Sequence, residues 1–173
     1  ECLVGSEMCI RDSPIFIGEK MAKHILSCSF GKDSIATALL ALQHGEPLDE
    51  LVYCEVMFNE EISGELPEHN RFIHETAIPY FEQRGIPTRV LRSEKTYLSC
   101  FYHVVTRGRM KGRLSGFPLS AHCAIQRDCK LPPIKAYQKA LPPDTVQYIG
   151  IAADEPKRLA RLKPGQISLL DKY

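Results

Sequence analysis

The sequence predicts an α/β protein in three layers, with a mainly parallel sheet covered by helices on both faces. Two observations carry this prediction. Short apolar segments typical of buried strands alternate along the chain with helical patterns of apolar residues. Strands that alternate with helices imply right-handed crossovers and parallel pairing. A polar loop also joins the first strand directly to the first helix, and such loops gather at the carboxyl edge of a parallel sheet.

The strands are expected at residues 24–28, 51–58, 88–91 and 146–151, and the helices at residues 34–44, 67–84, 97–106 and 133–141. Gly45 and Gly85 follow two of these helices as C-terminal caps. Pro79 is expected to kink or break the second helix, because proline removes a backbone N–H. The basic, glycine-rich stretch 107–120 is predicted to be a mobile loop.

Composition indicates a single soluble domain. The chain has 173 residues, of which 44% are hydrophobic and 25% charged. Its net charge of +1 gives no bulk signal for nucleic acid or membrane, and no apolar run is long enough to span a bilayer. Outside residues 1–13 the cysteine count is odd, and no secretory signal is present, which predicts a reducing, cytoplasmic setting.

The two ends of the chain are expected to differ from the rest. Residues 1–13, ECLVGSEMCIRDS, lack the parts of a signal peptide, and most of them can be encoded by the end of a transposon adapter used in short-read library preparation. The sequence thus predicts a non-native or disordered leader at residues 1–20, with Met21 as the natural start; a genuine disordered N-terminus is the alternative. Residues 167–173, ISLLDKY, show no cap or closing turn, so the domain at residues 21–173 is expected to lack its C-terminal part.

The loop between the first strand and the first helix reads SFGKDS. A loop entering a helix presents free N–H groups and the positive end of the helix dipole, which suits an anion. Gly31 would let a ligand approach the backbone, Ser29 and Ser34 add hydroxyl groups, and Lys32 adds a positive charge. Asp33 is expected to cap the helix by accepting backbone N–H bonds. A capped turn without any ligand is the alternative interpretation.

This loop, Ser29-Phe30-Gly31-Lys32-Asp33-Ser34, resembles the pyrophosphate-binding loop S-G-G-x-D-S of the PP-loop, or adenine nucleotide alpha-hydrolase, superfamily. Phe30 replaces the first glycine of that pattern, so its side chain must point away from the phosphates or the loop is altered.

Two later segments are similar to phosphoadenosine phosphosulfate (PAPS) reductases. HCAIQRDCKLPPI resembles their C-x-I-R-K-x-x-P-L region, and YIGIAADEPKR resembles their G-x-R-x-x-E-S-x-x-R segment. Gly150, Glu155 and Arg158 match the latter, whereas Ala152 stands where arginine is frequent. The resemblance covers residues 23 to about 162 and implies a Rossmann-like PP-loop nucleotide-binding domain.

The resemblance further implies an enzyme that binds PAPS or ATP and acts in sulfur-nucleotide reduction or sulfur transfer. Its partners would be the nucleotide, with Mg²⁺ as a candidate companion, and a thiol reductant or a sulfur-donor protein. The adenine would lie near Met57 and Phe58. Arg127, Lys130 and Arg158 would face the anionic groups, because a guanidinium matches phosphate and sulfate oxygens.

The cysteines leave the catalytic residue open. The E-C-G-L-H segment that carries the nucleophile of PAPS reductases does not occur in this sequence, so Cys123 is only a candidate. Cys123, Cys129 and the neighbouring His122 could supply soft metal ligands, but they do not complete a tetrahedral site. Zinc or an iron–sulfur cluster is therefore expected only in a longer gene product. Cys28 and Cys54 are expected in the core, whereas Cys100 is uninformative.

Three functions stay open at this point. The first is a PAPS-reductase-like oxidoreductase or transferase, which the ADEPKR segment favours. The second is a PP-loop ATP pyrophosphatase that adenylates tRNA or another substrate, with the basic residues 107–113 either touching RNA or closing over the nucleotide's phosphates. The third is a non-catalytic nucleotide-binding module. No membrane partner is expected.

Overall fold

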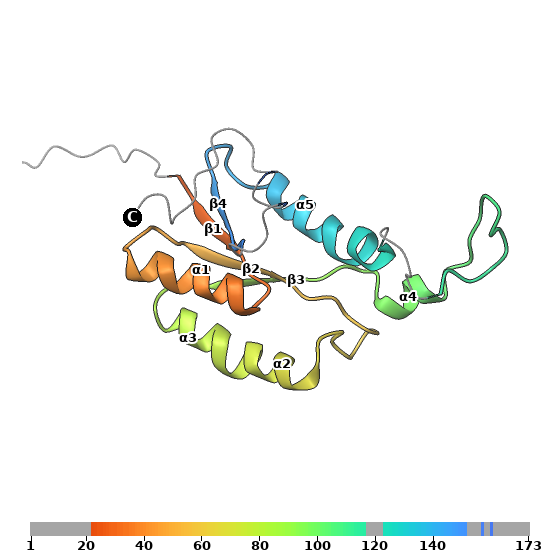
Figure 1. Cartoon of the computed structure of the whole chain (residues 1–173), viewed down its shortest axis with the longest axis horizontal. Helices are drawn as coiled ribbons and strands as arrows, with labels where there is room; N and C mark the ends of the chain where they lie inside the picture. The colour runs from red at the N-terminus through yellow and green to blue at the C-terminus, as the bar shows by residue number, and fades with distance from the viewer. Residues whose placement is uncertain (1–21, 117–122, 152–156, 158–159, 161–173) are drawn as a thin grey trace, which may run out of the picture.

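The computed structural model describes residues 22–116, 123–151, 157 and 160, and its described part contains a four-stranded, all-parallel sheet (Figure 1). The strands are β1 (His24–Ser27), β2 (Glu50–Cys54), β3 (Thr88–Leu91) and β4 (Val146–Ile149), in the spatial order β3-β2-β1-β4. The predicted α/β class and parallel pairing are confirmed.

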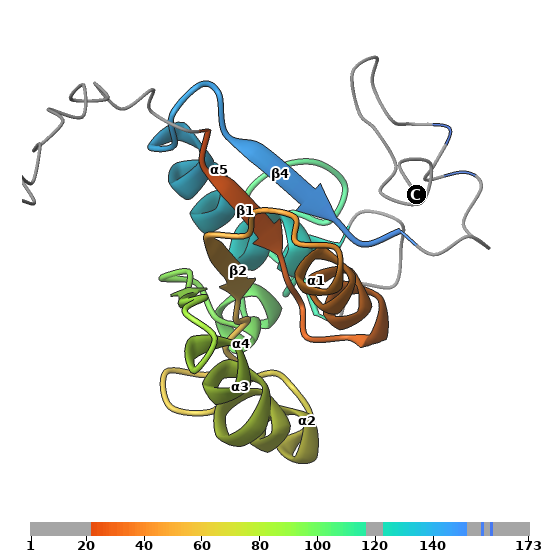
Figure 2. The same cartoon turned by 90° about the vertical axis from the view of Figure 1, so that its left-hand side faces the viewer.

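The helices are α1 (Lys32–Gln43), α2 (Pro67–Phe72), α3 (Ile78–Glu82), α4 (Tyr97–Phe101) and α5 (Leu131–Lys139), with π-helical turns η1 (Ile73–Ala77) and η2 (Gln126–Lys130). Helices α1, α2 and α3 lie on one side of the sheet and α5 lies on the other (Figures 1 and 2). Among the described residues, no helix has both the length and the apolar character needed to cross a membrane.

The main core fills the space between the sheet and the helices α1 to α3. Leu26 and Leu51 are neighbours in the β1–β2 register and point to the same side, as residues paired in parallel strands do. They pack with Phe30, Ala38 and Phe81. Every residue of β2 is buried, which is typical of a central strand covered by helices on both faces.

Proline explains the two π-helical turns. Pro79 was predicted to kink or break the second helix. Residues 67–82 stay helical, but the helix changes to a π-helical turn, η1, which directly precedes α3, where Pro79 sits in the first turn. A π turn is wider than an α turn and accommodates the missing N–H and the steric bulk of the ring. Likewise, η2 directly precedes α5, which begins at Leu131 and has Pro132 and Pro133 in its first turn.

Several predicted boundaries were wrong. The second strand ends at Cys54, and Met57 then forms only an isolated antiparallel bridge with Ser63. Helix α4 ends at Phe101 because a hairpin begins soon after it, with a bridge between Val104 and Leu114. Helix α1 begins two residues earlier than predicted, and β4 ends two residues earlier.

The strand order places a candidate site. The chain runs from β1 to β2 and β3 on one side and returns with β4 on the other side of β1. The strand order therefore reverses between β1 and β4. At such a reversal, α/β sheets bind ligands in the crevice outside the carboxyl ends of the strands. The loop at residues 28–31 and the segment that begins at Gly150 both leave the sheet here.

Candidate functional site

The loop that enters α1 bends sharply at Phe30. Its φ of 55° lies in the left-handed region, the only such value at a non-glycine position among the described residues. The side chain is only 2% exposed and meets Tyr53 edge-on, with 5.3 Å between the ring centroids. The Phe30 ring thus belongs to the core, and only its backbone is left for a ligand of the loop.

The start of α1 differs from the prediction. Gly31 is the N-cap, and no side chain caps the helix, so the expectation that Asp33 accepts the capping bonds was wrong. Asp33 lies in the first turn. The Ser34 hydroxyl donates to the Gly31 carbonyl at 3.0 Å and is buried. The first-turn N–H groups of α1 therefore have no side-chain cap, and the neighbouring residues Ser29 and Lys32 are exposed.

The two glycines of the motifs have different surroundings. A Cβ at Gly150 would lie 2.9 Å from the Asp33 carbonyl oxygen and 3.0 Å from Thr37 Oγ1, so the end of β4 packs tightly on the first turn of α1. A Cβ at Gly31 would meet only Ser29 Oγ, at 3.5 Å, and Gly31 has an ordinary φ of −75°. The protein's own packing therefore requires a glycine at 150 but not at 31.

His69 supports the loop and was missed in the sequence. Its Nε2 lies 3.2 Å from the Phe30 carbonyl oxygen, and its Nδ1 lies 3.3 Å from Glu65 Oε2. Both partners are acceptors, and a neutral imidazole has one N–H, so it donates to one of them at a time. When Nε2 carries the hydrogen, His69 links α2 to the bend of the loop. No spacing in the sequence signals this contact, because 39 residues separate the two positions.

At the expected adenine site, the backbone carbonyl groups are already occupied by hydrogen bonds within the protein. Met57 and Phe58 lie beyond the end of β2, and their carbonyl groups accept the N–H groups of Tyr97 and Leu98 at 2.8 and 3.0 Å. The Phe58 ring stacks on Tyr97 with 5.7 Å between centroids and remains 38% exposed. This edge therefore offers an aromatic face, while its carbonyl groups already serve the start of α4.

A buried carboxylate lies next to this edge. Glu55 directly follows β2. Its Oε2 forms an ion pair with Arg92 Nη2 at 2.7 Å, and its Oε1 lies 3.8 Å from His74 Nε2. Burial alone would raise the pKa of Glu55, but hydrogen bonds from Ser63 and Arg92 outweigh it and hold this pKa below its usual range. Glu55 was assigned to the predicted second strand. Its place in the sequence does not indicate the ion pair with Arg92, which lies 37 residues later.

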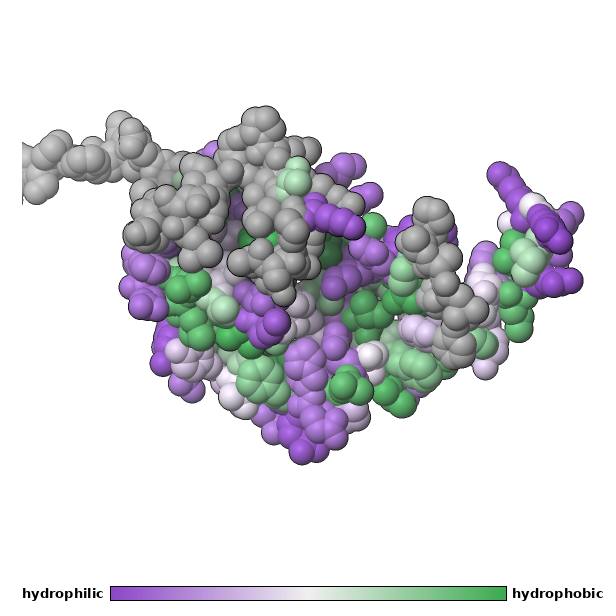
Figure 3. Space-filling model, viewed as in Figure 1, coloured by the Kyte–Doolittle hydropathy of each residue, from purple (hydrophilic) through white to green (hydrophobic). Residues whose placement is uncertain are grey.

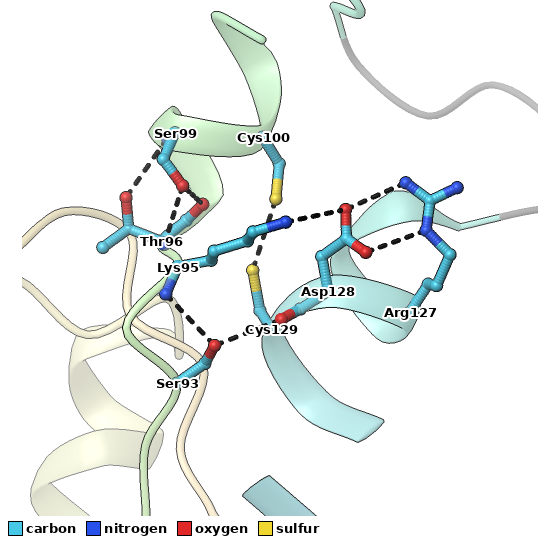
Figure 4. Close-up of polar contacts among 8 residues, drawn as sticks. All are labelled: Ser93, Lys95, Thr96, Ser99, Cys100, Arg127, Asp128 and Cys129. Atoms are coloured by element: carbon cyan, nitrogen blue, oxygen red, sulfur yellow. Dashed lines mark hydrogen bonds and ion pairs between the residues drawn. The ribbon is translucent and has the colours of Figure 1, made fainter. Parts of the chain in front are cut away.

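Arg127 and Lys130 lie on η2 (Figure 4). The Arg127 guanidinium binds both carboxylate oxygens of Asp128, at 2.8 and 2.9 Å, and Lys95 lies 3.7 Å from the same carboxylate. These hydrogen bonds lower the pKa of Asp128. The Lys130 carbonyl accepts the thiol of Cys54 at 3.5 Å, which places η2 over the end of β2. Within the described residues, no hydrogen bond or ion pair joins Arg127 or Lys130 to residues 29–34.

The fold pairs Cys129 with Cys100 rather than with Cys123. The two sulfur atoms of Cys100 and Cys129 are 3.5 Å apart, and both side chains are buried (Figure 4). Cys123 is half-buried, and its sulfur accepts the Gln126 N–H at 3.4 Å. Across residues 22–116 and 123–151, no three His, Cys, Asp or Glu side chains converge as metal ligands. Cys28 and Cys54 are buried, as predicted.

Glu155, Arg158 and His122, which the sequence singled out, lie outside the described residues. No family model matches the chain, and no curated protein or solved structure matches it either.

Proposed function

We propose that the chain is a nucleotide-binding domain that holds the phosphate or sulfate groups of an adenine nucleotide, ATP or PAPS, at the entrance of α1. The observation that carries this proposal is the glycine at position 31. Neither the backbone conformation nor the packing of the protein calls for a glycine there. A glycine in that place gives an external group close access to the backbone.

The surroundings of Gly31 suit an anion. The first-turn N–H groups of α1 point out of the helix without a capping side chain, and Lys32 adds an exposed positive charge. The site also lies at the reversal of strand order between β1 and β4. Gly150 brings the end of β4 against Asp33, so the segment after β4 starts beside the same loop.

The base would rest on the exposed ring of Phe58, which Tyr97 supports from the other side. A stacked pair of rings fixes the plane on which a base can lie. Since the carbonyl groups of Met57 and Phe58 already accept N–H groups of α4, stacking rather than hydrogen bonding to those carbonyls is the expected mode of contact.

For the reaction class, the resemblance to PAPS reductases favours sulfur-nucleotide chemistry. Cys123 is the candidate nucleophile because it is the one cysteine that is not buried among the five in the described residues. A thiol reductant or a sulfur-donor protein would then be the partner.

Isothermal titration calorimetry with ATP and with PAPS, each with and without Mg²⁺, tests the proposal. Gly31→Ala should fold normally, since its Cβ meets no close atom, yet it should lose nucleotide affinity by about tenfold or more. Lys32→Gln should lose about tenfold, the value of one charge-assisted hydrogen bond. Lys135→Gln, an exposed lysine on α5, is the matched control and should bind as the wild type. A folded wild-type protein that binds neither nucleotide would refute the proposal.

A further inference from the structure

One region of the chain is strongly basic although the whole is nearly neutral. From Lys95 to Arg127 the sequence contains six Lys or Arg residues and no Asp or Glu, whereas the full chain has 21 acidic residues and a net charge of +1. The four central charges, Arg107, Arg109, Lys111 and Arg113, are all exposed. Among the described residues, none of these four forms an ion pair. Their charge therefore faces solvent and is not neutralised within the described part of the fold.

These charges sit on a hairpin held by backbone hydrogen bonds, within the stretch 107–120 that was predicted to be a mobile loop. Val105 N–H donates to the Arg113 carbonyl at 2.9 Å, and Gly112 N–H donates to the Val105 carbonyl at 2.8 Å. Gly108 and Gly112 adopt φ values of 77° and 82°, which side chains disfavour, so glycine makes the turn feasible. We refer to residues 104–114 as the basic hairpin. It projects beyond α4, away from the body of the molecule (Figure 1).

A pre-formed hairpin binds at low cost, because its backbone is already ordered before the partner arrives. Within the described part of the chain, no hydrogen bond or ion pair joins the basic hairpin to residues 29–34. The charges on the hairpin therefore do not close over the loop at the entrance of α1 in this structure.

The basic hairpin also exposes apolar and aromatic groups. Tyr102, at its base, is 59% exposed, and Val104, Met110 and Leu114 are each about half exposed. The space-filling view shows hydrophilic and hydrophobic groups side by side along this projection (Figure 3). Positive charges beside exposed aromatic and apolar side chains suit a polymer with both phosphates and accessible base faces. In a duplex the base faces are stacked on one another, so a single strand fits this surface better.

We propose that the basic hairpin, with Tyr102 at its base, binds single-stranded nucleic acid. The four basic side chains contact phosphates, and the Tyr102 ring packs on a base. This inference does not depend on nucleotide binding at residues 29–34, because it uses a different surface.

Fluorescence anisotropy with a labelled single-stranded oligouridylate of about 12 nucleotides tests the proposal. The affinity of the wild type should fall as salt rises from about 50 to about 200 mM, because each neutralised phosphate releases counterions. The double variant Arg109→Gln/Lys111→Gln should bind at least about tenfold more weakly and should show a shallower dependence on salt. Tyr102→Ala should weaken binding by about tenfold with an unchanged salt dependence.

The matched control is Arg71→Gln/Lys135→Gln, which also removes one arginine and one lysine, both exposed, from α2 and α5. It should bind the oligonucleotide as the wild type. An equal loss in both double variants would overturn the proposal, because net charge alone would then explain binding. The proposal would also be overturned by tighter binding to a duplex of the same length, or by binding to vesicles containing anionic phospholipid without any binding to the oligonucleotide.

Discussion

The rings of Phe30 and Tyr53 meet edge-on, with 5.3 Å between their centroids and 74° between their planes. This contact holds the loop at the entrance of α1 in place from within the core. Phe30 has a left-handed backbone, with a φ of 55°, that favours glycine, yet its side chain fills the space between the sheet and the helices. The loop is therefore fixed by packing at Phe30 at the cost of backbone strain, and the two effects can be separated by mutation.

Phe30→Ala should destabilise the protein by about 3–5 kcal/mol, since it removes a buried aromatic side chain but keeps the strained backbone. Phe30→Gly should be more stable than Phe30→Ala by about 1 kcal/mol, because glycine adopts a positive φ without strain. Urea denaturation measures both values. Phe81 is equally buried but lies in the helix α3, and it provides the control. At this position the order should be reversed, with Phe81→Gly less stable than Phe81→Ala by about 1 kcal/mol. The same order at both positions would contradict the claim of strain at Phe30.

Gly150 and Gly31 offer a second comparison. Gly150→Ala places a Cβ 2.9 Å from a backbone oxygen of Asp33, which cannot move without shifting the start of α1. We expect a loss of about 1–3 kcal/mol, as for other overpacked sites. Gly31→Ala should stay within about 1 kcal/mol of the wild type, because its Cβ has room and its φ is ordinary. Chemical denaturation of both variants measures these changes in the free energy of unfolding. An equal loss in the two variants would contradict the claim that Gly150 is packed more tightly than Gly31.

Much of the fold could be predicted from the pattern of apolar residues within single segments of the sequence. The apolar segment at β1, the helical spacing of α1 and the short run at β3 are set by residues close in sequence. The bounds of β3 were predicted correctly, and those of β1 and α1 to within two residues. The second strand was extended too far because the run LVYCEVMF looks uniformly apolar apart from one glutamate. The chain in fact leaves the sheet after Cys54, and the next residue, Glu55, is buried against Arg92.

The site was harder to predict because its contacts join distant segments. The loop was identified from its own six residues, but its support by His69 comes from α2. Cys129 was matched to the nearby Cys123, whereas the fold brings it to Cys100, 29 residues away. The spacing of residues along the chain reports neighbours on one element, and it cannot report which elements will meet.

Glu50 gives a prediction about pH. This buried carboxylate at the start of β2 binds Lys23, Arg89 Nε at 3.0 Å and the Tyr137 hydroxyl at 2.6 Å. Burial alone would raise the pKa of Glu50, but these hydrogen bonds outweigh burial and lower it. A folded-state pKa below the unfolded value stabilises the fold above the unfolded pKa, and this contribution disappears as pH falls through the folded pKa.

Glu50→Gln should therefore lower the free energy of unfolding at neutral pH by about 1–3 kcal/mol, because the amide loses the charge-assisted hydrogen bonds of the carboxylate while Lys23 and Arg89 stay partly solvated. It should also make that free energy less dependent on pH in the acid range, where the carboxylate of the wild type is protonated. Urea denaturation between about pH 7 and about pH 3 measures both effects. Glu82→Gln, an exposed residue on α3, serves as the control and should follow the wild type. If the free energy of unfolding falls equally steeply with acid pH in Glu50→Gln and in the wild type, Glu50 does not contribute to the pH dependence of stability.

The cysteines should differ sharply in reactivity. Burial, together with the hydrogen bond and charge of Cys100, raises the pKa of the Cys129 thiol to about 12, so the thiolate that reacts with alkylating agents is scarce near neutral pH. Cys123 is half-buried and has no such neighbour among the described sulfur atoms. Iodoacetamide at about pH 8 should therefore label Cys123 first among the five cysteines of the described residues, as peptide mass spectrometry would show.

In urea, Cys123 and Cys129 should be labelled at similar rates, because unfolding removes both the burial and the contact with Cys100. Native labelling of Cys129 as fast as that of Cys123 would contradict the buried pair. The same measurement bears on the proposed chemistry at Cys123. If its thiol acts on the bound nucleotide, saturating PAPS should slow the labelling of Cys123, and Gly31→Ala should weaken that protection. Protection by PAPS that is unchanged in Gly31→Ala would separate Cys123 from the loop at the entrance of α1.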